Sequence, residues 1–217
     1  MPRIFIIDDH PVIRMGLSGL LSSEPGMFVC GEAGSAAEAI DAIRPAAPDL
    51  VLLDLALPDT NGLELLKEIL TNFPGIRVLV LSSHDERIYA ERVLRGGARG
   101  YVMKEEAPEL LALAVRAVIA GQIYVSEKIT GTIMEIFSGR KKSFSDRTSA
   151  LSNRELEVFT LIGQGKGSKA IGDELGIATR TVDAHRAHIK EKLHLADGKE
   201  LLRDAVRWVE ANNHQSD

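Results

Sequence analysis

The chain has only one cysteine, Cys30, few aromatic residues and no long apolar run. A single cysteine excludes an internal disulfide framework and a cysteine-based zinc site, and it is typical of a reducing cytoplasm. Aromatic residues make up 5% of the sequence, so the core must be mainly aliphatic. The longest uncharged apolar stretches, of about a dozen residues, are too short to span a membrane. The first apolar run ends before Asp8 and is too short for the core of a signal peptide. We therefore expect a cytoplasmic protein without a membrane segment.

Length and charge indicate two globular domains. A chain of 217 residues is long for one ordinary domain and comfortable for two. Its net charge of −5 argues against a protein that coats nucleic acid indiscriminately, but it permits a local basic face. The stretch 139–147 is basic, polar and rich in serine, which predicts an exposed linker.

The N-terminal part alternates between aliphatic runs and helical patterns. The runs at 4–7, 50–53 and 78–81 contain no polar residue, as in strands that are buried on both faces of a parallel sheet. Two weaker strand candidates lie at 27–30 and 101–103. Helical spacing is found at 11–21, 36–44, 62–70, 86–94 and 108–120. Five β-α pairs predict an α/β doubly wound domain with right-handed crossovers.

Polar residues follow four of these predicted strands. They are Asp8 and Asp9 after the first, Asp54 after the third, Ser82 after the fourth and Lys104 after the fifth. Ligands of such sheets bind beyond the carboxyl ends of the strands, where these side chains would meet. Taken singly, the acid pair could merely cap the next helix, and Ser82 and Lys104 could be ordinary surface residues. Their joint occurrence favours a functional site.

The residue types at these strand ends suit phosphoryl transfer. Clustered carboxylates favour Mg²⁺, which neutralises charge as a phosphoryl group moves to a carboxylate oxygen. Asp54 is the natural nucleophile because it ends the central strand. Lys104 can hold one phosphoryl oxygen as a point charge, and Ser82 can donate a hydrogen bond to another.

Residues 1–122 resemble a CheY-like receiver domain of two-component systems, which implies a flavodoxin-like fold. The resemblance rests on the acid pair, on Asp54 followed by Leu57-Pro58 and Asn61-Gly62, and on Ser82 and Lys104. It implies that Asp54 is the phosphoacceptor for a sensor histidine kinase.

The resemblance also assigns roles around Asp54. Asp9, Asp54 and the backbone carbonyl of Ala56 would bind Mg²⁺, with Asp8 helping directly or through water. Ser82 would be the switch hydroxyl. Tyr101, three residues before Lys104, would be the switch aromatic residue.

The C-terminal part contains four short helical patterns. They begin after Ser152, at Ser168, near Thr179 and after Asp197, and the second and third are separated by a tight turn. This arrangement predicts a helix-turn-helix. A helical dimerisation or protein-binding module is an alternative, because the net charge of this part is close to zero. The third helix, however, is locally basic enough to face phosphates.

Residues 149–209 resemble a LuxR-type DNA-binding domain. The motif consists of Leu151-Ser152-x-Arg154-Glu155-x-Glu157-Val158, Gly165-x-Gly167-Ser168-Lys169-x-Ile171 and Thr181-Val182-x-x-His185. Joined to a receiver, such a domain makes a response regulator of the NarL/FixJ family. The resemblance implies DNA binding by Lys169, Thr179, Arg180, Thr181, Asp183, Ala184, Arg186, Ala187 and Lys190, with Lys169 and Lys190 as phosphate contacts.

Two positions depart from the LuxR-type pattern. Ala178 stands where a serine usually caps the recognition helix, so we expect Thr179 to cap it instead. Asp183 stands where many relatives carry lysine. An acid there either reads a cytosine amino group or repels phosphate.

These features predict a transcription regulator controlled by phosphorylation. The expected domains are a receiver at 1–122, a connecting helix and linker at 123–148, and a DNA-binding domain at 149–217. The expected partners are a sensor histidine kinase, double-stranded DNA and a second copy of the chain when it is phosphorylated or bound to DNA. The only catalysis expected is self-phosphorylation and slow self-dephosphorylation.

The alternatives to this function are a Mg²⁺-dependent phosphohydrolase, a regulator whose output module binds protein, and a receiver that no longer takes phosphate.

Overall fold

The computed structural model describes residues 1–58, 60–106, 108–138, 148 and 150–213. The chain divides into two compact units, Met1–Lys142 and Ser143–Asp217, and each unit is described by itself. No helix in the described ranges is long and apolar enough to cross a membrane.

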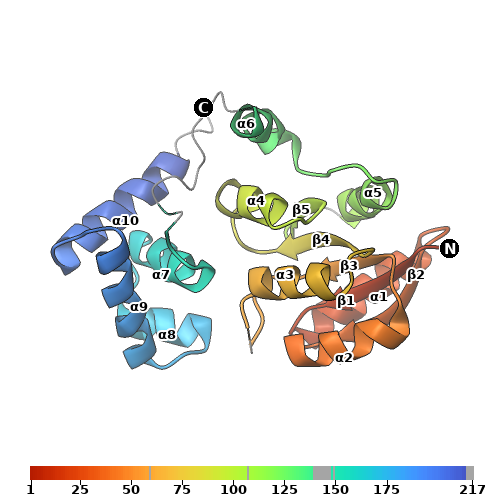
Figure 1. The fold of residues 1–217 in the computed structure, drawn as a ribbon, viewed down its shortest axis with the longest axis horizontal. Helices are drawn as coiled ribbons and strands as arrows, with labels where there is room; N and C mark the ends of the chain where they lie inside the picture. The colour runs from red at the N-terminus through yellow and green to blue at the C-terminus, as the bar shows by residue number, and fades with distance from the viewer. Residues whose placement is uncertain (59, 107, 139–147, 149, 214–217) are drawn as a thin grey trace. The chain divides into compact units, whose positions relative to one another are not determined.

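The first unit is built on one parallel five-stranded sheet (Figure 1). The strands lie in the order β2-β1-β3-β4-β5, so the chain crosses over between β2 and β3. This confirms the predicted doubly wound fold. The strands are β1 (Arg3–Ile7), β2 (Phe28–Ala33), β3 (Leu50–Leu53), β4 (Arg77–Ser82) and β5 (Gly100–Met103).

Helices pack on both faces of the sheet because successive strand residues point to opposite sides. Ile4, Ile6 and Leu52 share one core with residues of α1 (Pro11–Ser23) and α5 (Pro108–Ile119). Phe5, Ile7 and Val51 are equally buried on the other face. That face is covered by α2 (Ala36–Ala46), α3 (Gly62–Asn72) and α4 (Glu86–Arg95), of which α2 contacts β1 and β2, α4 contacts β5 and α3 packs beside α2.

The segment between β3 and α3 folds back closely on the end of β3. A Cβ atom on Gly62 would lie 2.6 Å from the carbonyl oxygen of Asp54 and 2.5 Å from the Cα atom of Leu55. Only glycine allows this approach, which explains the Asn61-Gly62 pair. The Asn61 side chain accepts a hydrogen bond from the Leu63 N–H and so caps α3. The loop next to Asp54 is thereby held at both ends.

The predicted strand at 27–30 was too short, and the connecting helix expected from residue 123 begins later. β2 continues to Ala33 because it pairs with the whole of β1. Tyr124 is extended, since its N–H donates to the Arg99 carbonyl and its own carbonyl accepts from the Tyr101 N–H, each at 2.9 Å. The helix, α6, therefore spans only Glu127–Phe137.

Helix α6 packs against α4 within the first unit. At its start, the Ser126 hydroxyl donates to Oε1 of Glu86 at 2.8 Å. At its end, the Arg95 guanidinium lies 5.2 Å from the centroid of the Phe137 ring. The linker predicted at 139–147 lies outside the described residues.

The second unit contains four helices among its described residues, as predicted. They are α7 (Asn153–Gly163), α8 (Ser168–Leu175), α9 (Thr179–Lys192) and α10 (Gly198–Asn213). Their core is aliphatic apart from Phe159 and the partly buried Trp208, whose ring centroids are 5.7 Å apart. Ser152 and Glu155 form a capping box at the start of α7.

The turn between α8 and α9 has the tight form of a helix-turn-helix. Gly176 ends α8 with a left-handed φ of +64°, which glycine adopts without strain. A Cβ on Gly172 would lie 2.7 Å from the Ile177 carbonyl oxygen, so the turn also needs glycine there. The expected cap by Thr179 is wrong. Ala178 occupies the N-cap position, with no side-chain hydrogen bond, and Thr179 is already helical.

Candidate functional site

Three carboxylates gather at the carboxyl edge of the sheet. Asp8 follows β1 and Asp54 follows β3, and these strands are neighbours, with the Asp54 N–H donating to the Ile7 carbonyl. Asp8 and Asp54 are 1% and 2% exposed, which is rare for acidic residues. One ligand atom from each of Asp8, Asp9, His10 and Asp54 lies within 4.8 Å of all the others. The predicted acid cluster therefore exists.

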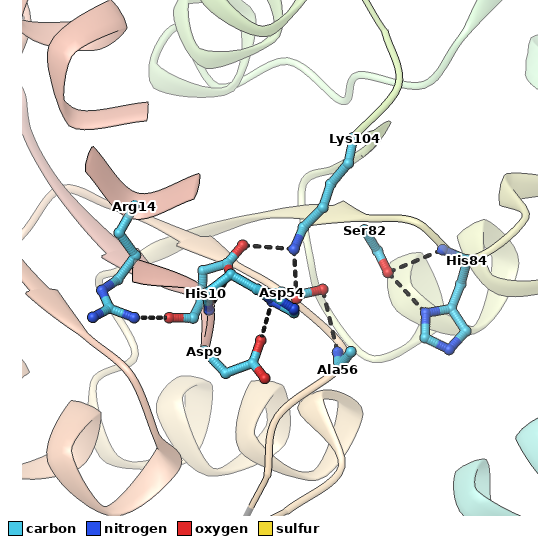
Figure 2. A network of polar contacts seen from close by, with 9 residues as sticks. Asp9, His10, Arg14, Asp54, Ala56, Ser82, His84 and Lys104 are labelled. Carbon is cyan, nitrogen blue, oxygen red and sulfur yellow. Dashed lines mark hydrogen bonds and ion pairs between the residues drawn. The ribbon is translucent and has the colours of Figure 1, made fainter. Parts of the chain in front are cut away.

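Lys104 places one cation between two of these acids (Figure 2). Its Nζ atom lies 2.6 Å from Oδ2 of Asp8 and 2.7 Å from Oδ2 of Asp54. Burial raises the pKa of Asp54, and Lys104 offsets part of this shift. Burial alone lowers the pKa of Lys104, but Asp54 and Asp8 outweigh it and raise that pKa. The lysine thus favours the ionised form of Asp54 that a nucleophile requires.

The other oxygen of Asp54 is held by the backbone. Its Oδ1 atom accepts a hydrogen bond from the Ala56 N–H at 3.2 Å. Residue 56 therefore lies beside the carboxylate, where its carbonyl was predicted to serve as a metal ligand. The three carboxylates form an all-oxygen donor set that fits Mg²⁺.

Ser82 and Tyr101 meet at His84 instead of at the acid cluster. The Ser82 hydroxyl lies 3.0 Å from Nδ1 of His84 and accepts a hydrogen bond from the His84 N–H. Tyr101 is fully buried, and its hydroxyl donates to the His84 carbonyl at 2.6 Å. Burial raises the pKa of Tyr101 well above its ordinary value, so it stays a hydrogen-bond donor.

Sequence reasoning missed two residues that support the acid pair. Nδ1 of His10 lies 2.6 Å from Oδ1 of Asp9, and the His10 N–H donates to Oδ1 of Asp8 at 2.8 Å. Arg14 donates to the Asp8 carbonyl oxygen at 2.6 Å. The signal was available, because His10 directly follows the acid pair and Arg14 lies one helical turn further on.

The second unit exposes the predicted DNA-binding residues on α9 and at the start of α8. Val182 and Ile189 are fully buried and attach α9 to the core. The predicted contacts that lie exposed are Lys169, Thr179, Arg180, Asp183, Ala184 and Ala187. Thr181, Arg186 and Lys190 are half-buried. The Ser168 hydroxyl donates to Oδ1 of Asp183 at 2.7 Å, which joins α8 to α9.

Two known families match the chain. The response regulator receiver domain matches residues 4–116, and the luxR family of bacterial regulatory proteins matches residues 149–205. The chain belongs to the LuxR-type two-component response regulators. Both families are regulatory, and this argues against a phosphohydrolase. The receiver match covers the acid cluster, and the luxR match covers α7, α8, α9 and the start of α10.

Relatives and solved structures agree with this assignment. The oxygen regulatory protein NreC of Staphylococcus haemolyticus is 37% identical over 210 residues, which cover 94% of this chain and 97% of that protein. A two-component response regulator of the LuxR family from Aurantimonas sp. is 35% identical, with a TM-score of 0.59 over 64% of this chain and 99% of its own. RcsB of Salmonella enterica serovar Typhimurium, solved bound to the rprA promoter with BeF3⁻, shares the fold with a TM-score of 0.62. That likeness has 23% identity and covers 96% of this chain and 98% of RcsB.

Glu155 joins the start of α7 to the end of α9 in this LuxR-type domain. Its Oε2 atom accepts from the Ser152 N–H and from Nζ of Lys192, each at 2.7 Å. Burial raises the pKa of Glu155, but the bonds from Lys192 and Ser152 outweigh it and lower the pKa overall. The ionised carboxylate therefore stabilises the folded domain.

We expect Glu155→Gln to lower the free energy of unfolding by about 1 kcal/mol at pH 7, because glutamine keeps the cap but loses the charge that faces the exposed Lys192. A lowered pKa contributes stability above the ordinary value of about 4.3, and this contribution is lost as pH falls through the folded pKa. The difference from wild type should therefore shrink in acid. Urea titrations at pH 7 and in acid measure the free energy of unfolding of both proteins. Trp208 fluorescence reports unfolding of this domain, because Trp208 packs in its core.

The control for this change is Glu174→Gln, which removes an acid from the exposed pair with Lys166. It should leave stability nearly unchanged. If the free energies of unfolding of wild type and Glu155→Gln differ as much in acid as at pH 7, the role assigned to the ionised carboxylate is contradicted.

Proposed function

We propose that Asp54 accepts a phosphoryl group from a sensor histidine kinase and that this controls the binding of α9 to double-stranded DNA. The observation that carries the proposal is the buried Asp54 carboxylate, with Lys104 at 2.7 Å and two further acids beside it. A structural ion pair would not need a third carboxylate at this strand edge. The regulator would act in the cytoplasm, where its DNA lies.

The proposed reaction transfers a phosphoryl group from a histidine nitrogen of the kinase to a carboxylate oxygen of Asp54. The P–N bond breaks as the P–O bond forms, and the electron pair returns to the imidazole. Bound Mg²⁺, held by Asp9, Asp54 and the Ala56 carbonyl with Asp8 direct or through water, would neutralise charge on the phosphoryl oxygens. Lys104 favours the ionised form of Asp54 before transfer and can then hold a phosphoryl oxygen.

The switch would act around His84, where Ser82 and Tyr101 meet. The Ser82 hydroxyl, which contacts Nδ1 of His84 at 3.0 Å, would donate a hydrogen bond to a phosphoryl oxygen. Tyr101 is already buried and bonded to the His84 carbonyl, so its ring does not have to move inward. Phosphorylation would therefore act on the loop between β4 and α4. This loop leads to Glu86, which holds α6 through Ser126.

DNA binding would use α9 as the recognition helix in the major groove. Lys169 and Lys190 would contact phosphates, while the exposed residues around Asp183 face the bases. Thr179, Arg180, Thr181, Ala184, Arg186 and Ala187 would lie near the DNA. A homodimer would read two half-sites about 10 base pairs apart. Phosphorylation could promote this dimer or release a masked DNA-binding domain, and footprints of bound DNA with and without a phosphodonor test the proposed control.

We expect Lys169→Ala and Lys190→Ala each to weaken binding to all DNA sequences. Removing one phosphate contact should also reduce the slope of log affinity against log salt by about one unit. Titrations of DNA at several salt concentrations measure both effects. Lys67→Ala, on the exposed side of α3 in the receiver, is the control. Unchanged affinity and salt slope in both lysine variants would show that α8 and α9 do not form the DNA face.

A further inference from the structure

Asp183 is an acid on a helix whose other charges are mainly positive. It is exposed, and its Oδ1 atom accepts a hydrogen bond from the Ser168 hydroxyl at 2.7 Å. Ser168 is the first residue of α8, and its N-cap, Gly167, offers no side-chain hydrogen bond. The free N–H groups and the helix dipole at this end favour a nearby carboxylate. The bond to Ser168 therefore restricts the orientation of Asp183.

This bond leaves the carboxylate with acceptor capacity. An ionised aspartate offers about four lone-pair sites, and Ser168 uses one of them. Asp183 is the fifth residue of α9, and the N-terminal residues of a recognition helix are those that contact base edges. Ala184 and Ala187 flank it with side chains too short to keep the helix away from the bases.

We propose that Asp183 reads the N4 amino group of a cytosine in each half-site. A carboxylate only accepts hydrogen bonds, and the major groove offers donors at cytosine N4 and adenine N6. Adenine presents its N7 acceptor beside N6, which repels a carboxylate, so cytosine is favoured. This inference rests on the proposed DNA binding and adds the base class that one residue selects.

Selection of bound sites from a random DNA library, with the full chain, tests this assignment. Wild type should select a C·G pair at one position of each half-site. Asp183→Asn should move the preference there from cytosine to adenine, because an amide can pair with both N6 and N7. Titration of matched sites should show about 5- to 150-fold discrimination by wild type, reversed or lost in the variant. Asp173→Asn removes an exposed acid from α8 and should keep the cytosine.

Ser168→Ala tests the positioning of the carboxylate. It should reduce discrimination at that one base pair while binding to other sequences is retained. If Asp183→Asn binds all sites more tightly with an unchanged preference, Asp183 only weakens binding and the assignment is wrong. If wild type binds no DNA, the proposed function itself fails, and circular dichroism of each variant separates either result from misfolding.

Discussion

Asp54→Asn is expected to abolish phosphorylation of the chain. The amide keeps the size of the side chain but removes the anionic oxygen that would attack phosphorus. Incubation with acetyl phosphate and Mg²⁺, followed by mass spectrometry of the intact protein and its peptides, measures this. Wild type should gain one phosphoryl group on the peptide that contains Asp54, and the variant should gain none there.

The matched control is Asp41→Asn, which changes an exposed aspartate on α2. It should be labelled like wild type. A chelator should prevent labelling of wild type, because the carboxylate cluster needs a cation to accept a further negative charge. Full labelling of Asp54→Asn, or labelling that a chelator does not affect, would show that the phosphoacceptor lies elsewhere.

Lys104→Met is expected to destabilise the receiver by about 3 kcal/mol, because it leaves Asp8 and Asp54 as buried carboxylates without their cation. Both acids are almost fully buried, so water can replace the lysine only in part. Mg²⁺ should recover part of the loss by supplying a cation to the same oxygens. Trp208 lies in the other unit, so its fluorescence does not report unfolding of the receiver. Amide hydrogen exchange in β1 and β3 measures the stability of the receiver instead.

Lys67→Met is the control for this change, since Lys67 is an exposed lysine on α3. Its effect should stay within about 0.5 kcal/mol. Equal exchange protection in Lys104→Met and wild type would mean that the ion pairs with Asp8 and Asp54 contribute nothing net to the fold.

The sheet and the acid cluster could be predicted from local patterns. Aliphatic runs without polar residues are typical of strands buried on both faces, and parallel strands bring their carboxyl ends to one edge. Asp8, Asp54 and Lys104 therefore meet wherever five such strands pair. The helices of the second unit could be predicted equally well from the sequence, because capping residues and glycines mark their ends.

Other features depend on contacts between distant residues. The extent of β2 follows from its pairing with β1, although Gly31 and Glu32 are poor strand formers. The late start of α6 follows from hydrogen bonds of Tyr124 with the edge of β5. Side-chain orientation is less predictable still. The bond of Ser168 to Asp183 depends on how two helices pack, and no spacing in the sequence indicates it.

One titration decides whether phosphorylation of Asp54 controls DNA binding. The full chain and Asp54→Asn are each titrated with DNA from a footprinted site, with and without acetyl phosphate and Mg²⁺. We predict that the phosphodonor raises the affinity of wild type by about 5- to 150-fold, the usual range of coupling between two sites. The variant should show no change. Equal affinity of wild type with and without the phosphodonor, despite full labelling of Asp54, would contradict the proposed control.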